Sequence, residues 1–313
     1  MIFPFLQCVE MNMGITKRPH AVVLAIPTQG HIKPMMQFSK ILSARGFYIT
    51  FVNTEFIQAK MTKSGSGNSM ADFRFETLPD GLPPHHGRTT QVDELCKSIS
   101  ENWPPLFEEL IEKLEKSLDV PPLTCIVYNS HLSWAQKTAK RLGIPGICFW
   151  TASACGLNIY FSAPLLMEKG FIPLKDKSYL TNGYLEEELT CVPGMPLLRM
   201  KDVPSLYYDD KPLHFRIFNT PKPRLAMTAD FMLINTFDEL EEPVMQALRA
   251  RFPVYGIGPL LLSAAAAAEQ QNGTVQYDFC EFMDRRKKLY AMAGRSGARF
   301  CCLCVLWKHN SYV

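Results

Sequence analysis

The sequence predicts an α/β fold: a Rossmann-like parallel sheet with helices on both faces. Continuous apolar runs such as HAVVLAI (20–26) and LTCIVYN (123–129) are typical of strands buried on both faces. Segments with apolar residues at helical spacing follow these runs. Strand and helix alternate along most of the chain, and such alternation favours a parallel sheet with right-handed crossovers.

The first unit of this sheet is a strand, a helix and a strand. The strand HAVVLAI is followed by a segment (33–46) whose apolar residues lie on one helical face. These residues are Met35, Met36, Phe38, Ile41 and Leu42. Gly46 ends the predicted helix, and FYITFVNT (47–54) is the next strand.

The following elements alternate in the same way. Thr54 can cap a helix that begins with EFIQAKM, and DFRFETL (72–78) predicts a strand. A long helical segment covers residues 92–118, and Pro104 and Pro105 are expected to interrupt it. Loops rich in Gly, Ser or Pro are expected at 63–69 and 80–88.

The second half of the chain continues the alternation. The remaining strands are predicted at 123–129, 146–150, 230–237 and 253–258. The helices between them are predicted at 132–142, 151–166 and 238–252. The helix at 151–166 has two candidate N-caps, Thr151 and Ser153, and the region 170–212 is rich in loops.

Polar residues follow the ends of three predicted strands. His31, Asn129 and Thr151 can therefore converge, because ligands of parallel sheets bind beyond the carboxyl ends of the strands. His31 is the best candidate base, since histidine titrates near neutrality and can take a proton from a hydroxyl. Gly30 lets the backbone turn tightly beside it. A lone loop histidine is also compatible with a purely structural role.

Composition and motifs exclude several classes of function. A net charge of +3 is too small to indicate nucleic acid or an anionic membrane as a partner. The segment PTQGHIKP matches neither GxGxxG nor GxxxxGK[ST], which removes support for a Rossmann dehydrogenase or a P-loop. The histidines and cysteines lack zinc-site spacing, so no metal is expected. We expect no secretory leader and no integral membrane segment, and hence a reduced, cytoplasmic protein.

Six segments carry a resemblance to a known family. They are HAVVLAIPTQGHIKPMMQFSKILSARGFYITFVNTEF, DFRFETLPDGLPP, LTCIVYN, GICFWTASACG, VPGMPLLRMKDVPS and FMLINTFDELEEPVMQALRARFPVYGIGPL. In this order they resemble the amino-terminal half of plant UDP-dependent glycosyltransferases. The branch that they resemble contains cyanohydrin and iridoid glucosyltransferases. The resemblance covers residues 18–262.

The resemblance implies a GT-B fold, in which a first domain (18–262) binds the acceptor and a second domain binds the UDP-sugar. It implies that His31 deprotonates an acceptor hydroxyl, which attacks and inverts the anomeric carbon of a hexose, with glucose expected. The UDP-sugar is then a co-substrate, and neither metal nor cofactor is needed. Thr151 matches a position that can contact the donor sugar, and Gln29 and Gly30 are further substrate-binding candidates. We expect a monomer that binds a small lipophilic acceptor.

Two loops, 80–90 and 170–210, match family segments that shape the acceptor pocket. His85 and His86 fall in the first of them and are candidate substrate-binding residues. A solvated pair on a loop is the alternative reading of these two histidines.

One departure from the family concerns the partner of His31. The family pattern IVSD is IVYN here, which places Asn129 where the family has an aspartate. An aspartate accepts the imidazole N–H and stabilises the imidazolium. Asparagine can accept through its carbonyl but carries no charge, so we expect reduced activity unless His131 compensates.

The second departure is at the end of the chain. Residues 1–17 predict a disordered extension, and residues 263–313 predict a linker and an aberrant remnant of the second domain, which is truncated. When the tail is back-translated and read one base forward, the codons of Met283 and Met292 each yield a tryptophan. The spacing of these two tryptophans matches that in the family, which suggests a frameshift. A divergent or disordered end is the alternative. The chain is therefore expected to be impaired or inactive alone, and a non-catalytic small-molecule-binding module or a nonfunctional truncation are alternative readings.

Overall fold

The structure, a computed structural model, describes residues 18–63, 72–88, 90–204, 207 and 228–260. The predictions for residues 1–17 and 263–313 lie outside these ranges, and the domain boundary at 262 stays a prediction. Within the described ranges no helix has both the length and the apolar character needed to cross a membrane.

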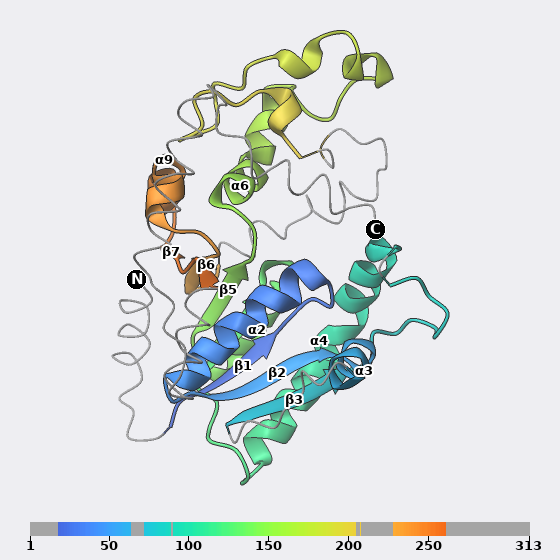
Figure 1. The fold of residues 1–313 in the computed structure, drawn as a ribbon, viewed down its shortest axis with the longest axis vertical. Coiled ribbons are helices and arrows are strands. Elements are labelled where there is room, and N and C mark those ends of the chain that lie inside the picture. Colours follow the sequence, from blue (N-terminus) through green and yellow to red (C-terminus); the bar gives the residue numbers. More distant parts are fainter. Residues whose placement is uncertain (1–17, 64–71, 89, 205–206, 208–227, 261–313) are drawn as a thin grey trace.

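A parallel sheet forms the centre of the molecule (Figure 1). Its strands are β1 (His20–Leu24), β2 (Tyr48–Thr54), β3 (Phe73–Leu78), β4 (Cys125–Asn129), β5 (Gly146–Trp150), β6 (Phe231–Ile234) and β7 (Val254–Gly256). They lie in the order β3-β2-β1-β4-β5-β6-β7, and every neighbouring pair is parallel. The order reverses between β1 and β4, and ligands bind beside such a switch point. All the predicted strands are confirmed, most of them with shorter ends.

Helices cover both faces of this sheet, which confirms the predicted fold class. They are α2 (Gln29–Ala44), α3 (Glu55–Lys63), α4 (Val92–Lys116), α5 (Ala135–Leu142), α6 (Ala154–Glu168) and α9 (Asp238–Arg249). Short 3₁₀ turns lie at Ser130–Leu132, Lys177–Leu180, Tyr184–Glu186 and Met200–Asp202. The last three lie in the region predicted to be rich in loops.

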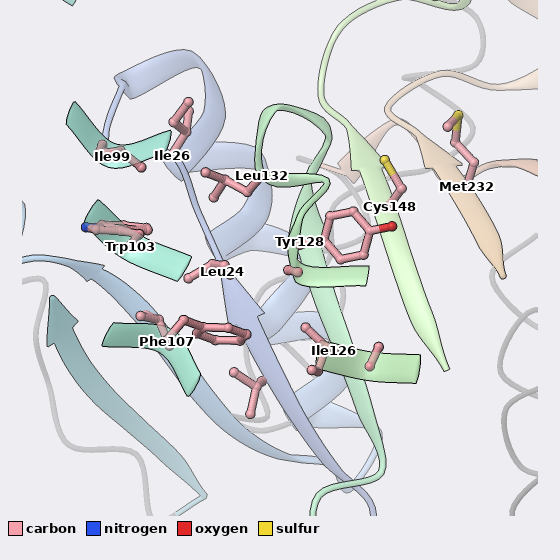
Figure 2. Packing of buried hydrophobic residues seen from close by; sticks show 14 of the residues in the cluster. Leu24, Ile26, Ile99, Trp103, Phe107, Ile126, Tyr128, Leu132, Cys148 and Met232 are labelled. Atoms are coloured by element: carbon pink, nitrogen blue, oxygen red, sulfur yellow. The ribbon is translucent and has the colours of Figure 1, made fainter. Parts of the chain in front are cut away.

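The alternation of side chains along each strand divides the core into two clusters. On β1, Val22 and Leu24 belong to one cluster, while Ala21 and Val23 belong to the other. The first cluster packs against α4, α5, α6 and α9, and the second packs against α2. Figure 2 shows the first cluster, where Trp103 of α4 lies near Leu24. Both faces are apolar, as continuous apolar runs require.

Helix α4 differs from its prediction, because Pro104 and Pro105 lie inside one helix and do not interrupt it. Proline removes an intrahelical hydrogen bond, but burial of the apolar stripe of α4 offsets this cost. That stripe comprises Leu95, Cys96, Ile99, Trp103, Phe107, Leu110, Ile111 and Leu114. The indole of Trp103 also donates to the carbonyl of Pro79 at 3.0 Å.

Helix α2 begins four residues earlier than predicted. The backbone N–H groups of His31 and Ile32 donate to the carbonyl of Thr28, at 3.0 and 2.9 Å. His31 therefore lies in the first turn of a helix and not on a loop. The apolar period starts only at Met35, and Pro34 is accommodated within the helix, so the sequence pattern does not reveal the first turn.

Candidate functional site

Three side chains from separate elements converge at the carboxyl ends of adjacent strands. His31 follows β1, Asn129 ends β4, and Thr151 follows β5. Nδ1 of His31 lies 2.8 Å from Nδ2 of Asn129 and 3.0 Å from Oγ1 of Thr151. The predicted convergence is confirmed by these distances, because the register of β1, β4 and β5 brings their ends to one edge. The chemical role of each residue stays a prediction.

The amide of Asn129 is oriented by the turn that follows β4. Its Oδ1 accepts a hydrogen bond from the backbone N–H of His131 at 3.2 Å and lies 3.0 Å from Nδ1 of that residue. A backbone N–H can only donate, so Oδ1 faces His131 and Nδ2 faces His31. The expectation that Asn129 accepts from His31 through its carbonyl is therefore wrong. The 3₁₀ turn at Ser130–Leu132 is the cause, since Asn129 is its N-cap.

His31 is neutral at physiological pH. Burial lowers the pKa of its imidazole from 6.5 to about 4, because the charged form loses its hydration. Its Nε2 makes no hydrogen bond to the residues that the structure describes, whereas Nδ1 has two polar neighbours. The nitrogen that remains to meet a ligand is therefore Nε2.

Aromatic rings fix the orientation of this imidazole. The ring of His131 lies edge-to-face with that of His31, at a centroid distance of 5.1 Å. On its other side His131 stacks on Trp150, with 6.3 Å between centroids and 14° between planes. The indole N–H of Trp150 donates to the carbonyl of Ser153 at 2.9 Å. His131 thus acts on the site through packing and through Asn129, whereas the sequence suggested it only as a neighbour that compensates for the missing carboxylate.

Ser153, and not Thr151, is the N-cap of α6. Its Oγ accepts from the N–H of Gly156 at 3.1 Å, which leaves the hydroxyl of Thr151 to His31. The Thr54 cap is confirmed as well, since Oγ1 of Thr54 accepts from the N–H of Ile57 at 3.2 Å. The two strand-end threonines therefore make different contacts.

Glu241 is a site-supporting residue that the sequence did not reveal. Its carboxylate accepts from the N–H groups of Ala154 and Cys155, at 2.9 and 2.8 Å, and from Oγ1 of Thr236. A buried carboxylate at a helix N-terminus satisfies free donors and the helix dipole. It anchors the start of α6, and so the backbone that carries Thr151. No local pattern could pair two residues 87 positions apart.

Gln29 and Gly30 form the exposed start of α2. The predicted reason for Gly30 is wrong, because its backbone is helical and does not make a tight turn. A Cβ added to Gly30 would meet no described atom within 4 Å. What the glycine provides is open space above the first turn of the helix, next to His31.

The loop at 80–88 is ordered by a charged pair. Arg88 donates through Nε and one terminal nitrogen to the two carboxylate oxygens of Asp80, at 2.6 and 3.0 Å. His85 is exposed, but the side chain of His86 is only 6% exposed and its Nε2 lies 3.1 Å from Glu94. The reading as a solvated pair is therefore correct for His85 and wrong for His86. No hydrogen bond or ring contact joins either histidine to His31 within the described ranges.

Neither the metal-ligating side chains nor the pockets of the described residues form a better candidate site than the His31 cluster. Within the described residues no three His, Cys, Asp or Glu side chains are grouped closely enough to hold a metal ion. A pocket of about 240 Å³ lies beside Leu114 and Ile144, and one of about 340 Å³ lies beside Arg249 and Tyr255. Neither is lined by the His31 cluster, and the polar pair in the second, Asp238 and Arg249, is an ion pair at 2.7 Å, so the cluster is the stronger candidate.

No family model matches the chain. The 7-deoxyloganetin glucosyltransferase of Gardenia jasminoides is 43% identical over 257 residues, which cover 80% of this chain and 53% of that protein. The (R)-mandelonitrile beta-glucosyltransferase of Prunus dulcis is 41% identical over 265 residues, covering 82% and 54%. This chain is a relative of the plant UDP-glycosyltransferases. It spans about half the length of the curated relatives that it matches.

Solved UDP-glycosyltransferase structures share the fold. A crystal structure of UDP-glucose: anthocyanidin 3-O-glucosyltransferase in complex with UDP matches 78% of this chain and 53% of its own, with a TM-score of 0.62 and 21% identity. Phytolacca americana UGT2, complexed with UDP-2fluoro-glucose and pterostilbene, matches 79% and 55%, with a TM-score of 0.59 and 19% identity. The predicted amino-terminal domain of a GT-B fold is thereby confirmed.

Proposed function

We propose that this chain is the acceptor-binding half of a UDP-glycosyltransferase. In a protein that also has a donor half, the reaction is the inverting transfer of a hexose from a UDP-sugar to the hydroxyl of a small lipophilic molecule. The observation that carries this proposal is the neutral imidazole of His31 at the carboxyl end of β1, with Nδ1 held by the protein and Nε2 left for a ligand. The glucosyltransferase activities of the named relatives support glucose as the sugar.

In this reaction the acceptor oxygen forms a bond to the anomeric carbon while the bond from that carbon to UDP breaks. The hydroxyl proton must leave, and the resemblance assigns its removal to His31, a step that needs an Nε2 without a proton. Thr151 and Asn129 position the ring. Thr151 also remains a candidate for substrate contact, as do Gln29, Gly30, His85 and His86. Asn129 carries no charge to stabilise an imidazolium, so slow transfer is expected.

The same proposal covers the sugar donor, the oligomeric state and the cellular compartment. The UDP-sugar is a co-substrate, and the resemblance implies that no metal is required. We also propose a monomer in the cytoplasm, a reducing compartment. Cys125 and Cys148, both buried in the core, form no disulfide with a described residue, which supports that location.

The test is to incubate the full chain with labelled UDP-glucose and a panel of phenols and terpenols, and to measure acceptor binding by calorimetry. Saturable binding that His31→Ala abolishes supports the proposal, and turnover would extend it to catalysis by this chain. Lys140→Ala, on the exposed side of α5, is the matched control. Binding without turnover favours a non-catalytic binding module. Absence of both contradicts the proposal and favours a nonfunctional truncation.

A further inference from the structure

The hydrogen bonds around Asn129 have a defined polarity. This series of hydrogen bonds begins at the backbone N–H of His131, which donates to Oδ1 of Asn129 at 3.2 Å. The other end of the same amide is Nδ2, 2.8 Å from Nδ1 of His31. An amide nitrogen has hydrogens and no lone pair to offer, so it donates and Nδ1 accepts.

Thr151 does not reverse this polarity. Its hydroxyl lies 3.0 Å from the same Nδ1 and can donate or accept, because a hydroxyl hydrogen rotates to suit its partner. Beside an Nδ1 that already accepts, the hydroxyl either donates to the lone pair or turns its hydrogen away. Both arrangements leave Nδ1 without a proton.

A neutral imidazole carries its single proton on one nitrogen, and an Nδ1 that accepts leaves that proton on Nε2. We propose that Asn129 inverts the tautomer of His31, so that the ring presents a hydrogen-bond donor to the ligand and not a base. The site then binds small aromatic or lipophilic ligands through an oxygen that carries no proton, above all a phenolate. This inference rests on the proposed function for the placement of the ligand beside His31.

Rotation of the amide does not restore the base. If Oδ1 faced His31, Nδ2 would face the backbone N–H of His131, and two donors would oppose each other in a fully buried position. A carboxylate has two accepting oxygens and meets both donors at once. Asn129→Asp, a change of nearly equal shape, is therefore expected to move the proton of His31 to Nδ1 and to free Nε2 as an acceptor.

The direct test is the position of the imidazole proton. The full chain is labelled with ¹⁵N at histidine, and two-bond ¹H–¹⁵N correlations are recorded at neutral pH, with His31→Gln to assign the signals of His31. We expect the proton on Nε2 in the unaltered chain and on Nδ1 in Asn129→Asp. A proton on Nδ1 in the unaltered chain overturns the inference, as does an unchanged tautomer in Asn129→Asp.

A second measurement tests the ligand. Para-nitrophenol absorbs differently as phenol and as phenolate, so its bound form can be read while it binds. The unaltered chain is expected to bind the phenolate, and thereby to lower the apparent pKa of the bound ligand. A bound neutral phenol overturns the inference.

The two proposals fail in different ways. If para-nitrophenol and the panel of phenols and terpenols do not bind while the proton lies on Nε2, the proposed function and the ligand assignment fail and the tautomer stands. If acceptors bind while the proton lies on Nδ1, the inference fails and the proposed function stands.

Discussion

Oγ1 of Thr151 lies 3.0 Å from Nδ1 of His31, the same nitrogen that Asn129 approaches at 2.8 Å. The contact joins the segment after β5 to the first turn of α2, across 120 positions of sequence. None of the three groups is charged at neutral pH, and burial holds the pKa of His31 at about 4. The site therefore depends on hydrogen-bond direction and not on ion pairing.

This lowered pKa predicts a loss of stability in mild acid. Well above pH 6.5 His31 is neutral in both the folded and the unfolded chain. As the pH falls from 6.5 to about 4, the unfolded chain takes up a proton that the folded chain does not, so the free energy of unfolding falls. We expect His31 to account for about 2 kcal/mol of this loss, less than the full linkage value because the residue as a whole keeps some exposure to solvent. Denaturant titrations over this pH range measure it.

His31→Gln is the control for that titration, since glutamine does not titrate. It is expected to reduce the pH dependence without removing it, because burial also lowers the pKa of His20. Equal pH dependence in the two proteins would show that His31 is not buried as described.

Glu241 predicts a link between stability and the site. Glu241→Ala leaves the N–H groups of Ala154 and Cys155 without their acceptor, so we expect the free energy of unfolding to fall by about 2–4 kcal/mol. Acceptor affinity is also expected to fall, because α6 begins three residues after Thr151. Glu242→Ala, at an exposed position of α9, should change stability by less than about 0.5 kcal/mol. If the two substitutions lowered the free energy of unfolding equally, Glu241 would not anchor the start of α6.

Alanine substitutions at two glycines distinguish the cost of backbone strain from the cost of a steric clash. Gly194 and Gly170 have similar positive φ angles, 73° and 75°. A Cβ at Gly194 would lie 2.6 Å from the carbonyl oxygen of Pro243, whereas one at Gly170 meets nothing within 4 Å in the described structure. Gly170→Ala is expected to cost about 1 kcal/mol, and Gly194→Ala about 3 kcal/mol, since the backbone of α9 must also move. Thermal unfolding of both variants measures the difference, and equal losses would contradict the close approach.

The sheet could be predicted from sequence because its strands are buried on both faces. Runs such as HAVVL and CIVYN cannot be exposed, and their spacing leaves room for crossover helices. Helix limits were harder to predict where proline occurs. Pro104 and Pro105 predict a break, but the buried face of α4 outweighs the lost hydrogen bond.

The convergence of the site could also be predicted, because His31, Asn129 and Thr151 all follow strand ends. The direction of its hydrogen bonds could not. It depends on the backbone N–H of His131, which every residue type but proline would supply, and so leaves no trace in side-chain identity. The burial of His86 and the reach of Glu241 to α6 likewise arise only from tertiary packing.

The most direct test of the account is a crystal structure of the full chain with a bound phenol. We expect the phenol oxygen within about 3 Å of Nε2 of His31, with Nδ1 still held by Asn129 and Thr151. A phenol bound elsewhere on the molecule, or an imidazole whose Nε2 is turned onto the protein, would contradict the assignment of this cluster as the acceptor site.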